Sequence, residues 1–559
     1  MDAFARKISR KDMLKLGLLG SAALMLPLER SARTELAVSR RLTSKQIPAP
    51  FQVRLPIPPV AQPVRSDDVP GADPSSGIPF TGTDYYEITM KAGQAQILPG
   101  FGATAVYGYN GVTPGPTIKA RQGRRAVVRQ INSLPDVARF GYKPWTSVHL
   151  HGSASLPQYD GYASDITNPG DFKDYVYPNF QDARTLWYHD HGVHHTAENA
   201  YMGLAAQYHL HDAIEDGLPI PKSYGRYDIP LTIRDAIFDT NGQLVYDDGG
   251  QSSLYGDVIL VNGAPWPVMK VERRKYRFRL LNASISRSYR LQLSTGQPMT
   301  VIATDGGLMP APQPVQNLRH GMAERYEVII DFSQNKIGDK VVLQNLSNPN
   351  NTNFGTTGQV MRFDVAGDSS DPTDNQVPNQ LNPDNKPMLL TAADAVKTRE
   401  MVFKRTPIAP GSLEEHWTVN GTTWDDVVAS NYRFTVANPR LNDVEIWELH
   451  NPGGGWFHPV HIHLVDFKVL SRSGGANRVF PYEQGPKDVV YVGEGERVRV
   501  LMRFGPQKGR YMMHCHNLVH EDHDMMAQFN VGDAYPDTVD PNDPVYAAQA
   551  ESLALAQTL

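Results

Sequence analysis

The sequence predicts an all-β protein built from three copies of one β-sandwich or Greek-key barrel domain. Three observations lead to this fold class. The length of 559 residues suits several domains, the 43 prolines and 46 glycines indicate many turns and edge strands rather than long helices, and one set of sequence features recurs three times in the same order.

In each copy the recurring features are an Asn-Gly turn, a strand that follows it, and a closing pair of strands. The turns are Asn110-Gly111, Asn262-Gly263 and Asn420-Gly421, spaced by 152 and 158 residues. The strands that follow alternate apolar and polar residues, which is typical of a half-buried strand, and end at Asn132, Asn282 and Asn451. The closing strands are expected near 186–189 and 207–210, 342–345 and 360–363, and 511–514 and 527–530.

These repeats, together with changes in composition, divide the chain. We predict an export leader at 1–42, a first domain at 43–215, a second at 226–366, a Pro/Asp/Asn-rich linker at 367–394, a third domain at 395–535 and a tail at 536–559. The proline-rich stretch from about residue 43 to 80 is expected to form an extended arm on the first domain.

The N-terminus resembles an export signal. Basic residues precede a 13-residue apolar run from Leu16 to Leu28, which is long enough for a signal sequence and too short to span a bilayer. The segment from Ser9 to Lys15 resembles a twin-arginine signal in which Lys11 replaces the second arginine. We therefore expect a periplasmic or secreted protein without a transmembrane segment; a buried N-terminal helix is the alternative.

Charge and cysteine content exclude several functions. A net charge of -5 argues against a nucleic-acid partner. The single cysteine, Cys515, excludes a disulfide framework and any zinc site that needs two thiolates.

Ten of the 18 histidines fall into four clusters that follow the repeat. They are His149 and His151; His189 and His191; His458, His461 and His463; and His514, His516 and His520. Residues i and i+2 of a strand share a face, so each His-X-His pair places two imidazoles side by side, spaced to bind neighbouring metal ions. The alternative, unrelated core or surface histidines, does not explain ten at these spacings.

Cys515 lies between two such histidines and should face the opposite way. With His458, His520 and a weak axial Met525 it completes the ligand set of a blue-copper centre. The other eight histidines can hold three further metals. The middle repeat carries Asn345-Leu346-Ser347 at the matching position, so the cluster should lie between the first and third domains, with the second as a spacer.

Motifs of the first and third repeats resemble the three-domain multicopper oxidases of cupredoxin-like domains, and more narrowly the bilirubin oxidases and bacterial spore-coat laccases. The matching segments are 111–118, 147–152, 186–191, 458–467 and 514–526. The resemblance implies four copper ions: type 1 at His458, Cys515, His520 and Met525; type 2 at His149 and His461; and a type 3 pair at His151, His189 and His516 and at His191, His463 and His514.

The resemblance also implies an activity, in which a small-molecule reducing substrate gives electrons to the type 1 site and Cys515 passes them to the cluster that reduces dioxygen. Asp160 and Glu521 match carboxylates that supply protons in the family, although orienting a ligand histidine is an equally open role. Trp456 matches a tryptophan near the substrate edge, or belongs to the core. His194, His195 and His523 are expected to be hydrogen-bonding or solvent-facing residues.

The favoured function is oxidation of bulky organic donors such as tetrapyrroles, phenols and aminophenols by a monomeric enzyme. A metallo-oxidase of Cu(I), Fe(II) or Mn(II) is the first alternative, weakened because the 17 methionines form no long cluster. A non-enzymatic copper-binding or coat protein is the second, and the complete ligand set disfavours it.

Overall fold

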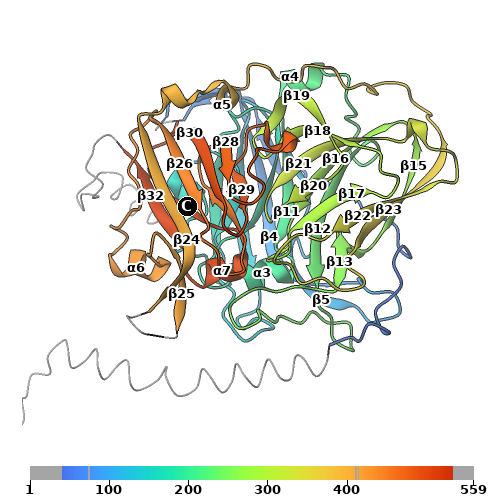
Figure 1. Ribbon diagram of the computed structural model, residues 1–559, viewed down its shortest axis with the longest axis horizontal. Coiled ribbons are helices and arrows are strands. Elements are labelled where there is room, and N and C mark those ends of the chain that lie inside the picture. Colours follow the sequence, from blue (N-terminus) through green and yellow to red (C-terminus); the bar gives the residue numbers. More distant parts are fainter. Residues whose placement is uncertain (1–40, 74–75, 409–411, 413, 533–559) are drawn as a thin grey trace, which may run out of the picture.

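A computed structural model describes residues 41–532, apart from 74–75, 409–411 and 413. Strands dominate, and the predicted all-β fold is confirmed (Figure 1). Residues 1–40 of the predicted leader and the predicted tail at 536–559 lie outside the described residues. Within the described part of the chain, no helix has the length and apolar character needed to cross a membrane.

The first repeat contains two main sheets. The first joins β1 (Arg65–Asp67), β4 (Thr83–Ala95), β7 (Arg125–Ser133) and β9 (Phe172–Tyr177), with β5 (Thr104–Tyr109) paired to β4. The second has the order β6 (Ile118–Arg121), β11 (Ala205–His211), β10 (Arg184–Asp190), β8 (Val148–His151). Shorter elements are β2 (Gly71–Ala72), β3 (Pro79–Phe80), η1 (Pro157–Tyr159), α3 (Thr196–Met202) and α4 (Ala213–Gly217).

The second repeat also has two sheets. One has the order β14 (Ala264–Pro265), β13 (Val258–Val261), β12 (Asp228–Ala236), β16 (Lys275–Asn282), β21 (Arg325–Asp331), β18 (Met299–Thr304), β19 (Gly307–Val315). The other has the order β15 (Val268–Arg273), β23 (Gln359–Asp368), β22 (Lys340–Leu346), β17 (Tyr289–Leu293), β20 (Leu318–His320), and η2 (Phe332–Gln334) follows β21.

The third repeat follows the same plan. Its sheets have the orders β25 (Glu415–Val419), β24 (Lys397–Pro407), β26 (Val444–His450), β30 (Arg497–Arg503), β28 (Phe467–Ser473), and β29 (Val489–Val492), β27 (His458–Ile462), β31 (Gly509–Cys515), β32 (Met526–Val531). The short helices are α5 (Lys386–Leu389), η3 (Ala392–Asp394), α6 (Trp424–Ala429), η4 (Pro481–Glu483) and α7 (Leu518–Asp522).

The three Asn-Gly turns share one geometry. Asn110, Asn262 and Asn420 have φ of 57°, 50° and 54°, and the glycine after each is also left-handed. Two consecutive positive φ angles define a type I′ turn, which favours asparagine and glycine. In each turn the asparagine Oδ1 accepts a backbone N–H from the strand that pairs with the one leading into the turn: Thr89 of β4, Thr232 of β12 and Val402 of β24. One local sequence therefore builds the same turn three times.

The predicted closing strands are confirmed as antiparallel pairs. They are β10 with β11, β22 with β23, and β31 with β32. In the first and third repeats these pairs end at the histidine motifs, so the repeat itself determines where the imidazoles lie.

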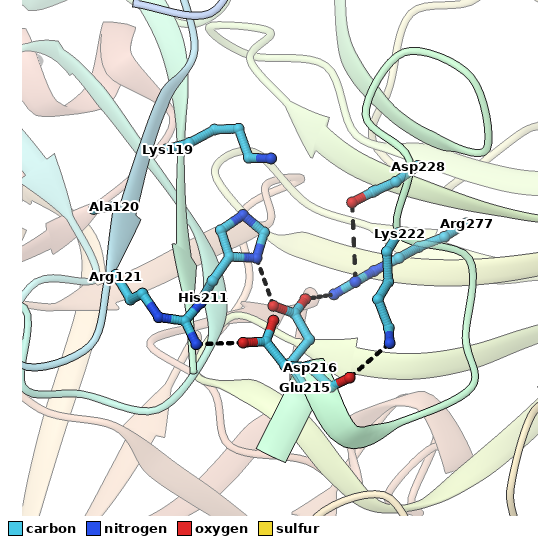
Figure 2. A pocket seen from close by; sticks show the side chains of 9 residues that line it. All are labelled: Lys119, Ala120, Arg121, His211, Glu215, Asp216, Lys222, Asp228 and Arg277. Carbon is cyan, nitrogen blue, oxygen red and sulfur yellow. Dashed lines mark hydrogen bonds and ion pairs between the residues drawn. The ribbon is translucent and has the colours of Figure 1, made fainter. Parts of the chain in front are cut away.

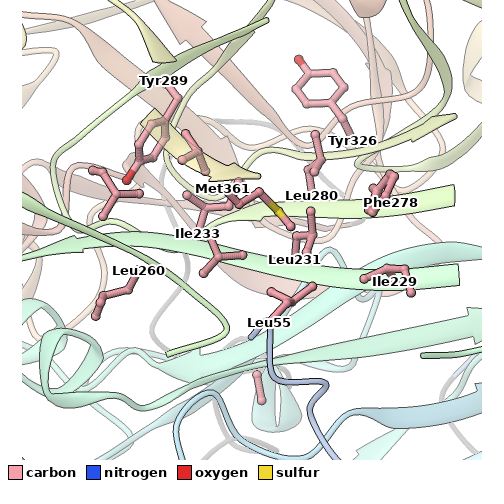
Figure 3. Close-up of a cluster of buried hydrophobic side chains, with 14 of the residues drawn as sticks. Leu55, Ile229, Leu231, Ile233, Leu260, Phe278, Leu280, Tyr289, Tyr326 and Met361 are labelled. Carbon is pink, nitrogen blue, oxygen red and sulfur yellow. The ribbon is translucent and has the colours of Figure 1, made fainter. Parts of the chain in front are cut away.

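The prediction that the N-terminal arm lies on the first domain is wrong for its first half. The N–H groups of Leu42, Phe51 and Leu55 donate to carbonyl groups of the second repeat. The side chain of Leu55 packs with Leu231 and other apolar residues of that repeat's core (Figure 3). Apolar side chains in the arm thus find burial on the second repeat, and the arm reaches the first repeat only from about residue 59, where Pro59 and Ala61 bond to Thr117.

Buried ion pairs join the first and second repeats. Arg279 of β16 contacts Glu215 of α4 at 3.0 Å, Asp228 at 2.9 Å and Glu327 at 2.9 Å. Arg277 reaches the same Glu215 from the same strand. A pocket of about 290 Å³ opens beside this network (Figure 2), and each carboxylate that lines it is already ion-paired. This junction is therefore a structural contact.

Candidate metal centre

All ten histidines of the four clusters are at most 1% exposed. Strand pairing brings them together: His149 of β8 lies opposite His189 of β10, and His461 of β27 lies opposite His514 of β31. The first pair belongs to the first repeat and the second pair to the third, so the imidazoles meet where those two repeats face each other.

One group consists of His458, Cys515 and His520. The Cys515 Sγ lies 3.4 Å from the Nδ1 of His458 and 3.7 Å from the Nδ1 of His520. Met525 is buried in the same apolar cluster, its N–H donates to the carbonyl of His520, and its carbonyl accepts the N–H of Cys515. The backbone N–H of Asn517 donates to Sγ at 3.4 Å, which favours a thiolate.

The other eight histidines form three groups, two of which share His151, and within each group the ligand atoms lie within 4.8 Å of one another. These groups are His149, His151 and His461; His151, His189 and His516; and His191, His463 and His514. The Nε2 atoms of His191 and His463 each lie 3.2 Å from the Nε2 of His514. The structure thus brings together the residues that the sequence assigned to one three-metal cluster.

The protonation of these imidazoles fits a bound cation. The Nδ1 atoms of His149 and His461 contact the carbonyl oxygens of Asp160 and Asp488, so each Nδ1 must carry the proton and donate. Burial lowers the pKa of both rings well below the ordinary value, and the rings are neutral. Two unprotonated Nε2 atoms then face each other at 3.4 Å, a repulsive arrangement that a metal ion between them relieves.

The type 1 group fits copper by the same reasoning. Burial lowers the pKa of His458 to about 3 and lowers that of His520 well below its ordinary value, so both imidazoles are neutral. Burial also raises the pKa of the Cys515 thiol. Loss of that proton therefore requires a neighbouring cation, and two imidazoles with one thiolate suit copper.

Both predicted carboxylates contact ligand histidines. The Asp160 Oδ2 lies 2.7 Å from the Nδ1 of His463, and the Glu521 Oε2 lies 2.7 Å from the Nδ1 of His514. Burial raises the pKa of Asp160 well above its ordinary value. Burial also acts to raise the pKa of Glu521, but the charges of the neighbouring imidazoles of His514 and His191 outweigh it, and this pKa is lowered.

Aromatic rings cover the outer side of the His520 ligand. Trp417 is 2% exposed and stacks on the His520 ring at 3.8 Å between centroids. Trp456 is half-buried and meets the same ring edge-on at 5.6 Å. The Arg405 guanidinium lies 4.3 Å from the Trp417 ring centre and 5.4 Å from the Trp456 ring centre. Of the two tryptophan rings, Trp456 is therefore the one that solvent reaches.

The three flanking histidines contact acidic residues. His194 lies 4.0 Å from Asp425, His195 lies 3.4 Å from Glu198, and His523 lies 3.6 Å from Asp248.

Sequence reasoning missed Trp417, Arg405, Arg325 and Asp488. Asp488 contacts His151 and Arg325 contacts Asp488, both from outside any histidine motif, and no local spacing marks them. Trp417 could have been suspected, because the strand that carries it precedes the third Asn-Gly turn.

Comparison with known proteins gives the same family along the chain. Family models described as multicopper oxidase match residues 90–214, 228–362 and 383–534. The chain is 45% identical over 493 residues to bilirubin oxidase from Albifimbria verrucaria, covering 86% of this chain and 81% of that protein. It is 33% identical to a laccase from Bacillus subtilis, covering 81% of this chain and 95% of that protein. The solved structure of the McoA multicopper oxidase from Aquifex aeolicus aligns with a TM-score of 0.74 at 29% identity, covering 87% of this chain and all of that chain.

Proposed function

The chain belongs to the multicopper oxidase family, oxidoreductases that act on dioxygen, and from that premise we propose that it couples one-electron oxidation of bulky organic donors to four-electron reduction of dioxygen to water. The donors are bilirubin-like tetrapyrroles, phenols and aminophenols.

We assign four copper ions: type 1 to His458, Cys515, His520 and Met525, type 2 to His149 and His461, and the type 3 pair to the two remaining groups of three histidines. Copper in these sites would supply the one-electron chemistry at the first group and the reduction of dioxygen at the cluster.

The position of Cys515 carries the proposal. Its Sγ faces His458 and His520, while its chain neighbours His514 and His516 belong to the histidine cluster. The Cys515 side chain therefore belongs to the first group, and one peptide bond to His514 and one to His516 connect it to the histidine cluster. This short covalent path favours an enzyme that separates donor oxidation from dioxygen reduction.

The acidic residues would take part in proton transfer at defined atoms. Asp160, whose pKa is raised, would hold a proton beside the Nδ1 of His463, and the Glu521 carboxylate, whose pKa is lowered, would accept one beside the Nδ1 of His514. The same contacts would orient these rings, so each carboxylate has two roles that experiment can separate.

The donor would approach over Trp456. Its half-buried ring offers an apolar surface and contacts the His520 ring edge-on. Arg405 supplies a positive charge beside it. A flat aromatic donor with a carboxylate suits this pair of groups.

Dioxygen uptake by the copper-loaded protein tests the proposal. Bilirubin, an aminophenol and Cu(I) are supplied in parallel as electron donors. We expect turnover with the organic donors; turnover with Cu(I) alone would favour the metallo-oxidase, and no turnover with any donor would contradict an oxidase. Export to the periplasm or medium, the monomeric state and the domain limits given above belong to the same proposal.

A further inference from the structure

Residues from all three repeats meet at one buried carboxylate beside the histidine cluster. Asp488 precedes β29 in the third repeat, Arg325 begins β21 in the second, and His151 ends β8 in the first. The Nη1 of Arg325 donates to Asp488 Oδ1 at 2.6 Å, and its Nη2 donates to Oδ2. The same Oδ1 lies 3.1 Å from the Nε2 of His151. All three residues are at most 1% exposed.

The contact with Asp488 reverses the orientation of His151 relative to its neighbours. His149, His461 and His463 contact oxygen atoms through Nδ1 and leave Nε2 for a metal. His151 contacts Asp488 through Nε2, and its Nδ1 is buried with no hydrogen-bond partner among the residues that the structure describes. Because a carboxylate in a bidentate ion pair can only accept, the Nε2 of His151 carries the proton, and Nδ1 offers the lone pair.

The Arg325 guanidinium is held on several sides. Its Nε donates to the carbonyl of Thr185 at 3.0 Å, and its other nitrogens donate to the carbonyls of Ala323 and Asp305. A guanidinium fixed in this way presents one rigid fork to a carboxylate. Asp488 therefore cannot rotate without losing two charge-assisted hydrogen bonds.

Gly152 supports the same geometry independently. It follows His151 with φ +88°, and a Cβ at this position would lie 2.6 Å from both Arg325 Nη2 and Asp488 Oδ2. The residue after the histidine motif thus leaves room for the ion pair.

We propose that Arg325 is a positioning residue for the copper cluster: it fixes Asp488, which holds the Nε2 of His151 and directs Nδ1 to the metal. The second repeat, predicted to be a spacer without ligands, then contributes directly to the geometry of the site. The inference rests on the copper assignment proposed above.

The test compares Arg325→Met and Arg325→Lys with a matched control, Arg184→Met. Arg184 forms another buried pair between repeats, with Asp466 at 2.8 Å, and within the described residues none of its hydrogen bonds or ion pairs involves a histidine. Each protein is loaded with copper. Copper per chain, the electron paramagnetic resonance of the type 2 ion, the visible absorption of the Cys515 site, and the affinity of the cluster by chelator competition are then measured.

We expect Arg325→Met to keep the visible absorption and to weaken copper binding at the cluster by about 10- to 100-fold. The type 2 resonance should change as well, because the carbonyl oxygen of Asp488 accepts the Nδ1–H of His461, a type 2 ligand. Arg325→Lys keeps the positive charge but loses the two parallel N–H donors of the guanidinium, and it should recover part of the copper affinity. Arg184→Met should change only stability. Wild-type resonance and affinity in Arg325→Met would overturn the inference, as would an equal spectroscopic change in Arg184→Met.

If Arg325→Met does not fold, the same measurements are made on Arg325→Lys and Asp488→Asn. Unchanged copper binding in both variants would again overturn the inference. Failure of the wild-type protein to bind copper at the cluster would instead contradict the proposed function.

Discussion

The Nε2 atoms of His149 and His461 face each other at 3.4 Å, although the two residues belong to different repeats. Both Nδ1 atoms donate to backbone carbonyls, so the facing atoms are unprotonated and repel each other without a cation. The interface between the first and third repeats is therefore built to enclose metal.

Copper should stabilise the fold as well as catalyse the reaction. A ligand that binds only the folded state adds about 4 kcal/mol at a thousand times its dissociation constant. We expect removal of copper by a chelator to lower the thermal midpoint and re-addition of copper to restore it, as followed by differential scanning calorimetry. An equal midpoint with and without copper would contradict this.

Cys515→Ser should remove one copper ion and leave the cluster. Serine is close in size to cysteine, and the neighbouring His514 and His516 keep their places on β31 and just after it. We expect the visible absorption of the thiolate site to disappear, copper per chain to fall by one, and the type 2 resonance to remain. Loss of all copper would instead mean that the two groups load only together.

The sequence predicted those features that depend on local pattern. Asn110 and its two counterparts mark the repeat, because a type I′ turn demands those residue types, and the spacing of His149 and His151 predicts a shared face. Arg325 and Asp488 were not predictable in this way, since their contact depends on how separate repeats pack. The path of the arm was predicted wrongly because proline content indicates extension but not the surface that covers Leu55.

Two substitutions separate the roles of Asp160. Asn at this position can still accept the Nδ1–H of His463 but cannot carry a proton, whereas Ala can do neither. If Asp160 moves protons, Asp160→Asn should keep copper and slow dioxygen reduction by about 100-fold or more, while Asp160→Ala should also lose copper. Stopped-flow reoxidation with copper analysis measures both. Glu521→Gln serves as the parallel case at His514, and wild-type turnover in both Asp160→Asn and Glu521→Gln would exclude proton transfer by these groups.

Trp456 and Trp417 should differ although both touch His520. We propose above that the donor approaches over the half-buried Trp456, so Trp456→Ala should raise KM for bulky organic donors with little change in stability. Trp417 is buried and stacked, so Trp417→Ala should cost about 3–5 kcal/mol and shift the type 1 absorption. Steady-state kinetics and chemical denaturation distinguish them, and the reverse pattern would contradict this assignment.

Arg279 should matter for stability alone. Its guanidinium contacts the carboxylates of Asp228, Glu215 and Glu327 in a buried site. Arg279→Met would leave these three buried acids with Arg277 as the one remaining arginine that contacts them among the described residues. Removing one partner of a buried ion pair costs about 3–5 kcal/mol. The control is Arg121→Met, which breaks an exposed pair with Asp216 and should cost less than about 1 kcal/mol. Chemical denaturation of both variants checks the difference. Within the described residues, no hydrogen bond or ion pair of Arg279 involves a histidine of the cluster, so the copper content and visible absorption of Arg279→Met should match the wild type. A loss of copper in this variant would show that the junction between the first and second repeats also acts on the metal site.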